Sequence, residues 1–476
     1  MGDPVDAGTA FDPHSMTPER LTAVAREDTM RVTIVGAGPA GLFLGATLAR
    51  RGHQVTAVDR DPGPDGAERW SRRGVMQFHH AHAFRQTVAD ALARELPEAL
   101  DGWLALGAEP VRSDLPGQPD APMGHRSTRE TFERALRDAA AGTPGFELRV
   151  GHVDTIVRRD GRASGVVVDG ATYDADLVVD ASGRAGRVSR ELGRRHQVGG
   201  PCGMAYVDRV YRLRPGAEPG PMTNPIAWQA DCEGYLCLIF RHEHGMFSVV
   251  IVRPADDPAL RDLRHEAAFT AAARAIPGLA DWTDPARSAP VTDVLPGGPL
   301  LNVYRSQCTD DGDLVLPGLV FVGDSVATTT PVFGRGVTTT LWQCEALLSL
   351  LDHDTQDLAG VGLALDAWAA DLMRPWVEDH ILMDGDRVAR WSGRDVDLEA
   401  PLPSDLILEA AQVRPEIMAS AAGYLSMAAL PATLREAEPI AREVYAGGWR
   451  PAYAAGPGRD ELVEIVARAV AQPQRA

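Results

Sequence analysis

Three histidines stand within four positions of the segment GVMQFHHAHAFR, residues 74–85: His79, His80 and His82. Imidazoles at this spacing raise two chemical hypotheses, a metal site and a catalytic base. Metal ligands must converge on one point. Adjacent residues diverge on any regular element, and residues two apart diverge on the helix that AFRQTVADALARELPEAL predicts. The segment has no His-x-x-x-His pair and no paired acid, so we predict no metal site.

The segment RVTIVGAGPAGLFLGATLARRGHQVTAVDRD, residues 31–61, predicts a dinucleotide-binding unit. A buried strand is expected over 31–35, a helix to about residue 51 and a second strand ending at Asp59. Gly36 allows the tight turn, Gly38 admits a pyrophosphate at the helix N-terminus, and Gly41 allows close helix packing. Asp59 is placed to accept the ribose hydroxyls. The candidate contacts are Gly36, Gly38, Ala40, Gly41, Asp59 and Arg60.

A second fingerprint, LVFVGDSVATTTPVFGRG at residues 319–336, predicts a buried strand, a polar loop and a helix from about 337 to 350. Together the two fingerprints resemble the glutathione-reductase type of FAD fold, specifically the p-hydroxybenzoate-hydroxylase-like flavoprotein monooxygenases. The resemblance implies that Gly323 and Asp324 lie at the ribityl and pyrophosphate part of FAD. It also implies that the loop with Pro331, Gly334 and Gly336 passes the isoalloxazine ring.

The residues between the fingerprints extend this resemblance. STRETFERALRDAA, residues 127–140, resembles the family helix whose arginine reaches the cofactor, which implicates Arg129 and leaves Arg126 as a competitor. DADLVVDASGRAGR, residues 174–187, resembles the strand that ends in an aspartate near the flavin, with Asp180, Gly183 and Arg187.

The electron donor stays open at this point. Many NADPH-using members carry Asp-Gly where this chain has Asp180-Ala181, and no second Gly-x-Gly-x-x-Gly is present. NAD(P)H is therefore expected as the ultimate donor, either directly or through a separate flavin reductase. Arg335, inside the ring loop, is a candidate for stabilising an anionic flavin or peroxide.

The histidine segment belongs to a longer resemblance, over residues 72–108, to bacterial polyether epoxidases, which are squalene-epoxidase-like flavoenzymes. Their pattern Gly-Val-Pro-Gln-x-x-His-x-His is matched by Gly74, Val75, Gln77, His80 and His82. The resemblance places Gln77 and His80 beside FAD, and simple packing at a helix start is the alternative. His79 falls at a variable position.

Residues 195–310 predict a substrate domain built on an antiparallel sheet, with a hairpin turning at HEHG. The candidate pocket residues are Met204, Tyr206, Trp228, Leu238, Phe240 and Phe247. Each of them also fits an ordinary core position.

The expected fold class is α/β: a glutathione-reductase-type, Rossmann-like FAD domain, an inserted antiparallel substrate domain and a C-terminal helical region. We expect a flexible N-terminal extension over 1–29, an FAD domain over 30–194 and 311–351, and a helical region over 352–476. Part of 85–125 could join the substrate domain.

Composition restricts the partners. The formal net charge of −19 disfavours nucleic acid and anionic membranes. The sequence shows no secretory signal and no apolar run near the ~18 residues of a membrane span. Five scattered cysteines fit reduced thiols in the cytoplasm.

The resemblance implies an FAD-dependent monooxygenase of secondary metabolism that uses O₂ and reduced flavin, through a C4a-hydroperoxide, to oxygenate a small organic substrate. Alkene epoxidation and hydroxylation are both open, and the absence of a conspicuous acid–base pair in the substrate domain favours epoxidation. The alternatives are a geranylgeranyl-reductase-like ene reductase, an aromatic hydroxylase using NAD(P)H directly, and a non-catalytic FAD-binding sensor. Flavin halogenases share the fold but rely on a lysine, and this chain has none.

Overall fold

The computed structural model describes residues 29–66, 70–72, 74–113, 120–184, 186 and 192–471. The chain divides into two compact units, one formed by Val396–Pro451 and the larger one by Thr29–Asp395 with the segment that starts at Ala452. The expected N-terminal extension up to residue 28, and Arg187, lie outside the described residues.

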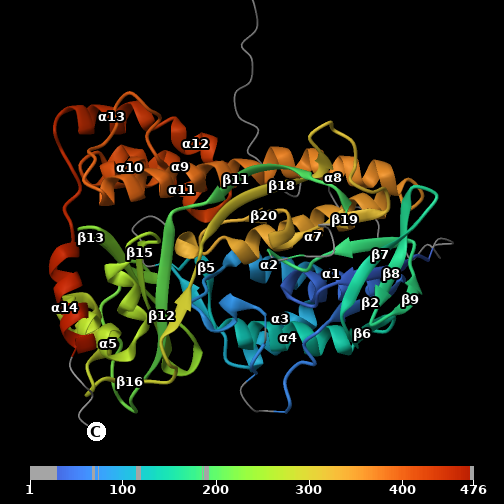
Figure 1. The fold of residues 1–476 in the computed structure, drawn as a ribbon, viewed down its shortest axis with the longest axis horizontal. Helices are drawn as coiled ribbons and strands as arrows, with labels where there is room; N and C mark the ends of the chain where they lie inside the picture. Colours follow the sequence, from blue (N-terminus) through green and yellow to red (C-terminus); the bar gives the residue numbers. More distant parts are fainter. Residues whose placement is uncertain are drawn as a thin grey trace, which may run out of the picture. The chain divides into compact units, whose positions relative to one another are not determined.

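The larger unit contains a five-stranded parallel sheet in the order β19-β10-β1-β2-β6, of which Figure 1 labels β19, β2 and β6. The strands are β1 (Arg31–Val35), β2 (Gln54–Asp59), β6 (Phe146–Val150), β10 (Leu177–Asp180) and β19 (Leu319–Phe321). Their apolar, β-branched residues are buried between α1 (Pro39–Arg50), α4 (Arg129–Ala141) and α7 (Gly336–His353). This is the Rossmann-like FAD domain that the two fingerprints predict, because β1 and β19 lie on either side of β10.

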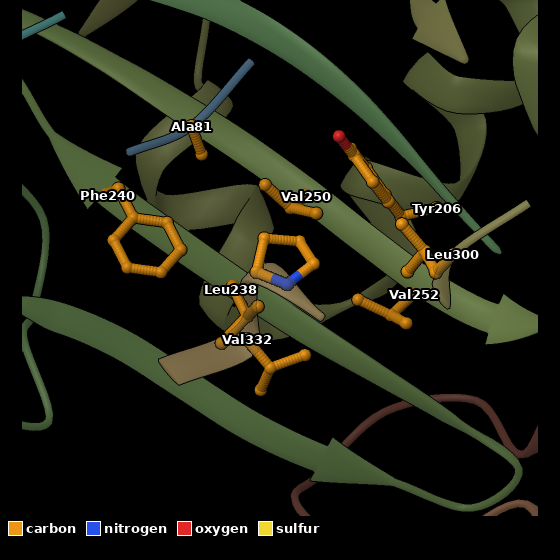
Figure 2. Close-up of a pocket in the computed structure, with 9 residues that line it drawn as sticks. Ala81, Tyr206, Leu238, Phe240, Val250, Val252, Leu300 and Val332 are labelled. Atoms are coloured by element: carbon orange, nitrogen blue, oxygen red, sulfur yellow. The ribbon is translucent and has the colours of Figure 1, made fainter. Parts of the chain in front are cut away.

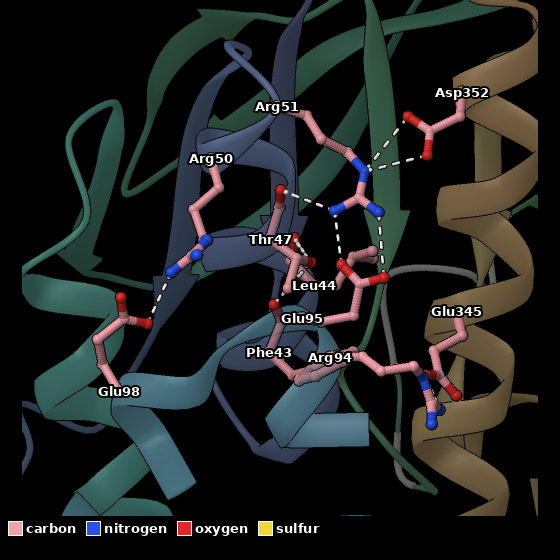
Figure 3. Close-up of polar contacts among 10 residues, drawn as sticks. All are labelled: Phe43, Leu44, Thr47, Arg50, Arg51, Arg94, Glu95, Glu98, Glu345 and Asp352. Carbon is pink, nitrogen blue, oxygen red and sulfur yellow. Dashed lines mark hydrogen bonds and ion pairs between the residues drawn. The ribbon is translucent and has the colours of Figure 1, made fainter. Parts of the chain in front are cut away.

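Ion pairs join the helices of this layer (Figure 3). Arg51, directly after α1, binds Glu95 of α2 (Gln86–Glu95) at 2.8 Å and Asp352 of α7 at 3.2 Å. Arg50 binds Glu98 of α3 (Pro97–Ala105) at 2.6 Å. The helix predicted over AFRQTVADALARELPEAL is divided into α2 and α3, because Pro97 lacks the N–H that a continuous helix would need.

A second, antiparallel sheet has the order β13-β14-β15-β12-β16, with β17 paired to β12. The strands are β12 (Met204–Leu213), β13 (Ala227–Cys232), β14 (Tyr235–Arg241), β15 (Met246–Pro254), β16 (Ser288–Pro290) and β17 (Leu295–Gly297). The hairpin of β14 and β15 turns at Glu243–Gly245, as the HEHG stretch predicts. One face of the sheet is covered by α5 (Glu266–Ala275), α6 (Pro277–Thr283) and α14 (Arg459–Ala471).

A three-stranded sheet, β11-β18-β20, includes one strand of the second fingerprint, β20. Its strands are β11 (Arg195–Pro201), β18 (Leu301–Thr309) and β20 (Ala327–Thr328). The helices α8 (Leu358–Leu372) and α9 (Arg374–Trp391) pack on β18. Two small antiparallel sheets complete the larger unit: β3 (Phe84–Arg85), β4 (Glu109–Arg112) and β5 (Pro122–Arg126), and β7 (Val153–Arg159), β8 (Arg162–Val168) and β9 (Ala171–Asp174).

The smaller unit is helical, with α10 (Ser404–Glu409), α11 (Met418–Ser426), α12 (Pro431–Arg435) and α13 (Glu438–Ala446). The Glu438 carboxylate joins separate segments of this unit. It accepts a hydrogen bond from the Leu402 backbone N–H at 2.9 Å and forms ion pairs with Arg435 and Arg442. Across the described ranges, no helix is both long and apolar enough to cross a membrane.

Candidate FAD and substrate site

The turn between β1 and α1 can be formed only by glycine at two positions. Gly36 has a φ of +102°, and a Cβ there would stand 2.7 Å from the carbonyl oxygen of Ala181. A Cβ on Gly41 would stand 1.9 Å from the carbonyl oxygen of Gly36. The turn is therefore closed against the end of β10 on one side and against its own helix on the other, as the fingerprint requires.

The N-terminus of α1 is open to an anionic ligand. Gly38 begins the helix without a side-chain cap, and a Cβ there would meet only the Nη1 atom of Arg72, at 3.8 Å. The first-turn N–H groups, with the positive end of the helix dipole, are left to a phosphate. These features fit the pyrophosphate of FAD.

Arg72 is a site residue that the sequence did not reveal. Its guanidinium is buried and forms ion pairs with Asp59 and Glu133. Burial opposes its charge, but the carboxylates of Glu133, Asp59 and Asp61 outweigh this and raise the pKa of Arg72. Arg72 is not one of the residues that match the Gly-Val-Pro-Gln-x-x-His-x-His pattern, so only the fold places its cation beside Gly38.

Asp59 anchors the dinucleotide turn through its side chain. Its Oδ2 atom accepts from the Ala37 backbone N–H at 2.7 Å, and its Oδ1 atom accepts from that of Asp61 at 2.9 Å. A contact of Asp59 with the ribose stays a prediction. Arg60 is exposed and points toward Gly74, where a Cβ would lie 3.3 Å from its Nη2 atom.

The two fingerprints meet at Gly323. Its φ is +70°, and a Cβ there would lie 3.4 Å from the Cβ atom of Ala40 in α1. The next residue, Asp324, accepts a long hydrogen bond of 3.5 Å from the side-chain amide of Gln77. Burial raises the pKa of Asp324, and the charge of Arg129 acts in the opposite direction. Ala40, Gln77 and Asp324 come from distant parts of the sequence and lie together at the end of the parallel sheet.

Arg129 is held in place within α4. Its Nε atom donates to Glu133 at 2.5 Å, and Glu243, from the hairpin tip of the antiparallel sheet, accepts from the backbone N–H and the hydroxyl of Thr128. Arg126, the competitor in sequence, instead donates to the carbonyl of Pro225 at 3.0 Å. Asp180 ends β10 buried, and its Oδ1 atom accepts from the Ser182 backbone N–H at 3.0 Å.

The proposed ring loop is pressed against the histidine segment. Gly334 has a φ of +60°, and a Cβ there would lie 2.6 Å from that of Ala83. Arg85 donates to the carbonyl of Phe333 at 2.7 Å. Gly336 begins α7 without a side-chain cap, and a Cβ there would meet nothing within 4 Å. The loop therefore leaves open backbone at the N-terminus of α7, where a flat ring can approach.

Arg335 turns away from this opening. Its guanidinium is buried, lies 3.2 Å from a carboxylate oxygen of Asp379 in α9, and stacks over the rings of Phe333 and Trp376. The structure thus gives Arg335 a partner on α9 that fixes the ring loop. Its direct action on a flavin or peroxide stays a prediction.

An apolar pocket lies between the loop and the antiparallel sheet (Figure 2). It is lined by Ala81, Tyr206, Leu238, Phe240, Val250, Val252, Leu300, Pro331 and Val332. Of the candidate pocket residues, Tyr206, Leu238 and Phe240 line it, and Met204 is buried in the same apolar cluster. Pro331 thereby forms part of the pocket wall that faces the sheet strands.

Trp228 and Phe247 lie on the opposite face of the same sheet. They pack in the core beneath α5 and α6, where the rings of Phe247 and Trp282 are 4.8 Å apart. Successive side chains on a strand point to opposite faces, so Phe247 and Val250 in β15 cannot share one side. Both faces are apolar in sequence, and the sequence pattern therefore gives no means of separating them.

The three opening histidines diverge. His80 is buried against Asp208 and Tyr206 of β12, and the Nδ1 atom of His82 lies 2.9 Å from the carbonyl oxygen of His80. Burial, with the charge of Arg129 adding to it, lowers the pKa of His82 to about 3. His79 stacks edge to face on Phe78. In the part of the chain that the structure describes, no group of three or more His, Cys, Asp or Glu residues could hold a metal ion.

Comparison with known proteins identifies an FAD-binding domain in this chain. Residues 29–210 match the family "FAD binding domain". Squalene monooxygenase 1,1 of Brassica napus is 28% identical over 167 residues, which are 33% of this chain and 30% of that protein. Protein Rv3254 of Mycobacterium tuberculosis is 26% identical over 373 residues, 69% of this chain and 74% of that protein.

Among solved structures, the flavin-dependent brominase Bmp2 superposes with a TM-score of 0.61 at 15% identity, covering 88% of this chain and 99% of that chain. This likeness shows the fold. The chain spans less than half of the length of the first curated relatives it matches. The matched residues contain the whole first fingerprint and support FAD as the cofactor. The homologues support an FAD-dependent oxidoreductase enzyme.

Proposed function

We propose that this protein is an FAD-dependent monooxygenase that inserts one oxygen atom of O₂ into an apolar small molecule. When bound, reduced FAD supplies the electrons that activate O₂, and the second oxygen atom leaves as water. The chain's own residues bind FAD at Gly38, Arg72 and Asp324, and place an apolar ligand beside the ring loop.

The apolar pocket carries the proposal. Pro331 and Val332 of the ring loop and Tyr206, Leu238 and Phe240 of the antiparallel sheet line the same space. A ligand in this space would lie against the loop that the family places beside the flavin ring, in surroundings that exclude water. Water exclusion protects activated oxygen from wasteful decay.

The decisive experiment uses FAD-loaded protein, reduced anaerobically and then mixed with isotopically labelled O₂. Styrene serves as the alkene probe and 2-naphthol as the phenol probe. We expect labelled oxygen in a product of one probe, and loss of that product when Leu238→Phe fills the pocket. Hydrogen peroxide as the only product with both probes would contradict the proposal.

The electron donor is tested with the same protein. NADH and NADPH are supplied without any other protein, and then with a separate flavin reductase. Because Asp180 is followed by Ala181 and no second dinucleotide fingerprint is present, we favour reduction through the separate reductase. Fast reduction of bound FAD by NADPH alone would overturn that preference.

Two competitors share the fold. The Bmp2 likeness raises halogenation, but this chain contains no lysine and cannot perform lysine-dependent halogen transfer. An ene reductase would reduce styrene-like alkenes and would incorporate no labelled oxygen, so the experiment above also separates it from a monooxygenase.

The five cysteines are all free thiols, which fits a cytoplasmic protein.

A further inference from the structure

A buried carboxylate stands at the edge of the apolar pocket. Asp208, in the middle of β12, is fully buried. Its Oδ2 atom accepts from the Ala81 backbone N–H at 2.7 Å and lies 3.5 Å from the Nδ1 atom of His80. Its Oδ1 atom and the Nδ1 atom of His80 have no hydrogen-bond partner among the described residues, so the 3.5 Å contact is a close approach and not a hydrogen bond. A charge in such surroundings is costly unless a nearby group compensates it.

His80 connects this carboxylate to the pocket. Its ring meets the Tyr206 ring edge to face, with centroids 5.0 Å apart, and both Tyr206 and the adjacent Ala81 line the pocket. Its Nδ1 atom faces the Asp208 carboxylate. Nε2 lies on the other side of the ring and is the nitrogen that we assign to a ligand.

The neighbouring histidines do not compete for the proton. Burial lowers the pKa of His82 to about 3, and burial also lowers the pKa of His242 despite the charges of Glu243 and Asp208. Both therefore stay neutral near neutral pH. Arg129 is occupied by Glu133. His80 is the imidazole that faces the Asp208 carboxylate.

We propose that His80, backed by Asp208, accepts a proton from a hydroxyl group of the ligand in this pocket. With Nδ1 facing the carboxylate, the imidazole carries its proton there and offers a lone pair at Nε2. The ligand O–H bond breaks and an Nε2–H bond forms. The ligand becomes an oxyanion, and the imidazolium lies beside the Asp208 carboxylate. No electrons are transferred in this step.

The inference rests on the proposed function and sharpens its substrate class. An oxyanion on an aromatic ring or enol pushes electron density onto the neighbouring carbon, which favours attack on electrophilic oxygen there. Alkene epoxidation needs no such base. The pair therefore points to an apolar substrate with one ionisable hydroxyl, such as a phenol. The sequence alone showed no acid–base pair because Asp208 and His80 lie more than 120 residues apart.

Binding of 4-nitrophenol to the FAD-loaded, oxidised protein tests this without turnover, since the phenol and its anion differ in absorption. We expect the bound probe to ionise at a pH about one unit lower than the free probe. His80→Gln should abolish this shift. Asp208→Asn keeps an oxygen for the Ala81 N–H and should reduce the shift. His79→Gln is the matched control and should retain it.

Neutral phenol bound to the wild-type protein would overturn the proposal, and so would an unchanged shift in His80→Gln or no binding of 4-nitrophenol. The methyl ether 4-nitroanisole cannot ionise, and its binding reports the pocket alone. Oxygen insertion is measured separately. If the probe ionises but no labelled oxygen is inserted into any probe, the proposed function fails and the proton acceptor stands. If labelled oxygen is inserted but the bound probe does not ionise, only the assignment of His80 as the proton acceptor fails.

Discussion

The two faces of the antiparallel sheet are made from the same strands and are almost equally apolar, yet they serve different purposes. The face beneath α5, α6 and α14 is a closed core around Trp282, which is fully buried. The face toward the ring loop leaves a pocket and buries a carboxylate, Asp208, beside it. The difference shows that the elements laid over a sheet, rather than the hydrophobicity of its strands, make one face a core and the other a site.

The largest expected effect contrasts two aromatic truncations. Trp282→Ala should lower the free energy of unfolding by about 3–5 kcal/mol, because the closed core cannot fill the cavity. Phe240→Ala should cost less than about 2 kcal/mol, because its ring already borders open space. Denaturant unfolding of the FAD-loaded protein measures both changes. Equal losses would mean that the pocket face is packed as tightly as the core.

Adjacent residues of β14 give a finer contrast. Leu238 lines the pocket, and Ile239 faces the core. Ile239→Phe should destabilise the protein by about 1–3 kcal/mol through overpacking. Leu238→Phe should change stability by less than about 1 kcal/mol and block binding of 4-nitroanisole. A strongly destabilised Leu238→Phe variant that still binds this ligand would contradict the assignment of the two faces.

The smallest effect is a pH dependence from His82, in the segment over the pocket face. Its pKa is about 3 in the folded protein and about 6.5 when unfolded, so the unfolded chain binds more protons between these values. Its contribution to stability is complete above about pH 6.5 and is lost as the pH falls toward 3. The slope stays below about 1.4 kcal/mol per pH unit. His82→Gln should flatten that part of the stability profile, and an unchanged slope would exclude His82 as its source.

The FAD domain was predictable from sequence because its signals are local. Gly41 is demanded by its contact with Gly36 in the same strand–turn–helix unit, Gly36 by its own positive φ, and the strands over 31–35 and 54–59 follow from short apolar runs. The order of the two fingerprints also predicts that they share one sheet. Arg72 was not predicted as a site residue, because it precedes the matched residues of the histidine segment and its ion pairs with Asp59 and Glu133 depend on the fold.

The amino-acid sequence by itself determined the dinucleotide turn, the strand and helix pattern and the absence of lysine, since these depend on neighbouring residues or on composition. Tertiary structure alone decided which face of the antiparallel sheet holds the pocket and that Arg335 turns to Asp379. It also brought His80 to Asp208. The physical reason is that side-chain alternation places every apolar strand residue on one of two faces, and only packing between distant segments determines what covers each face.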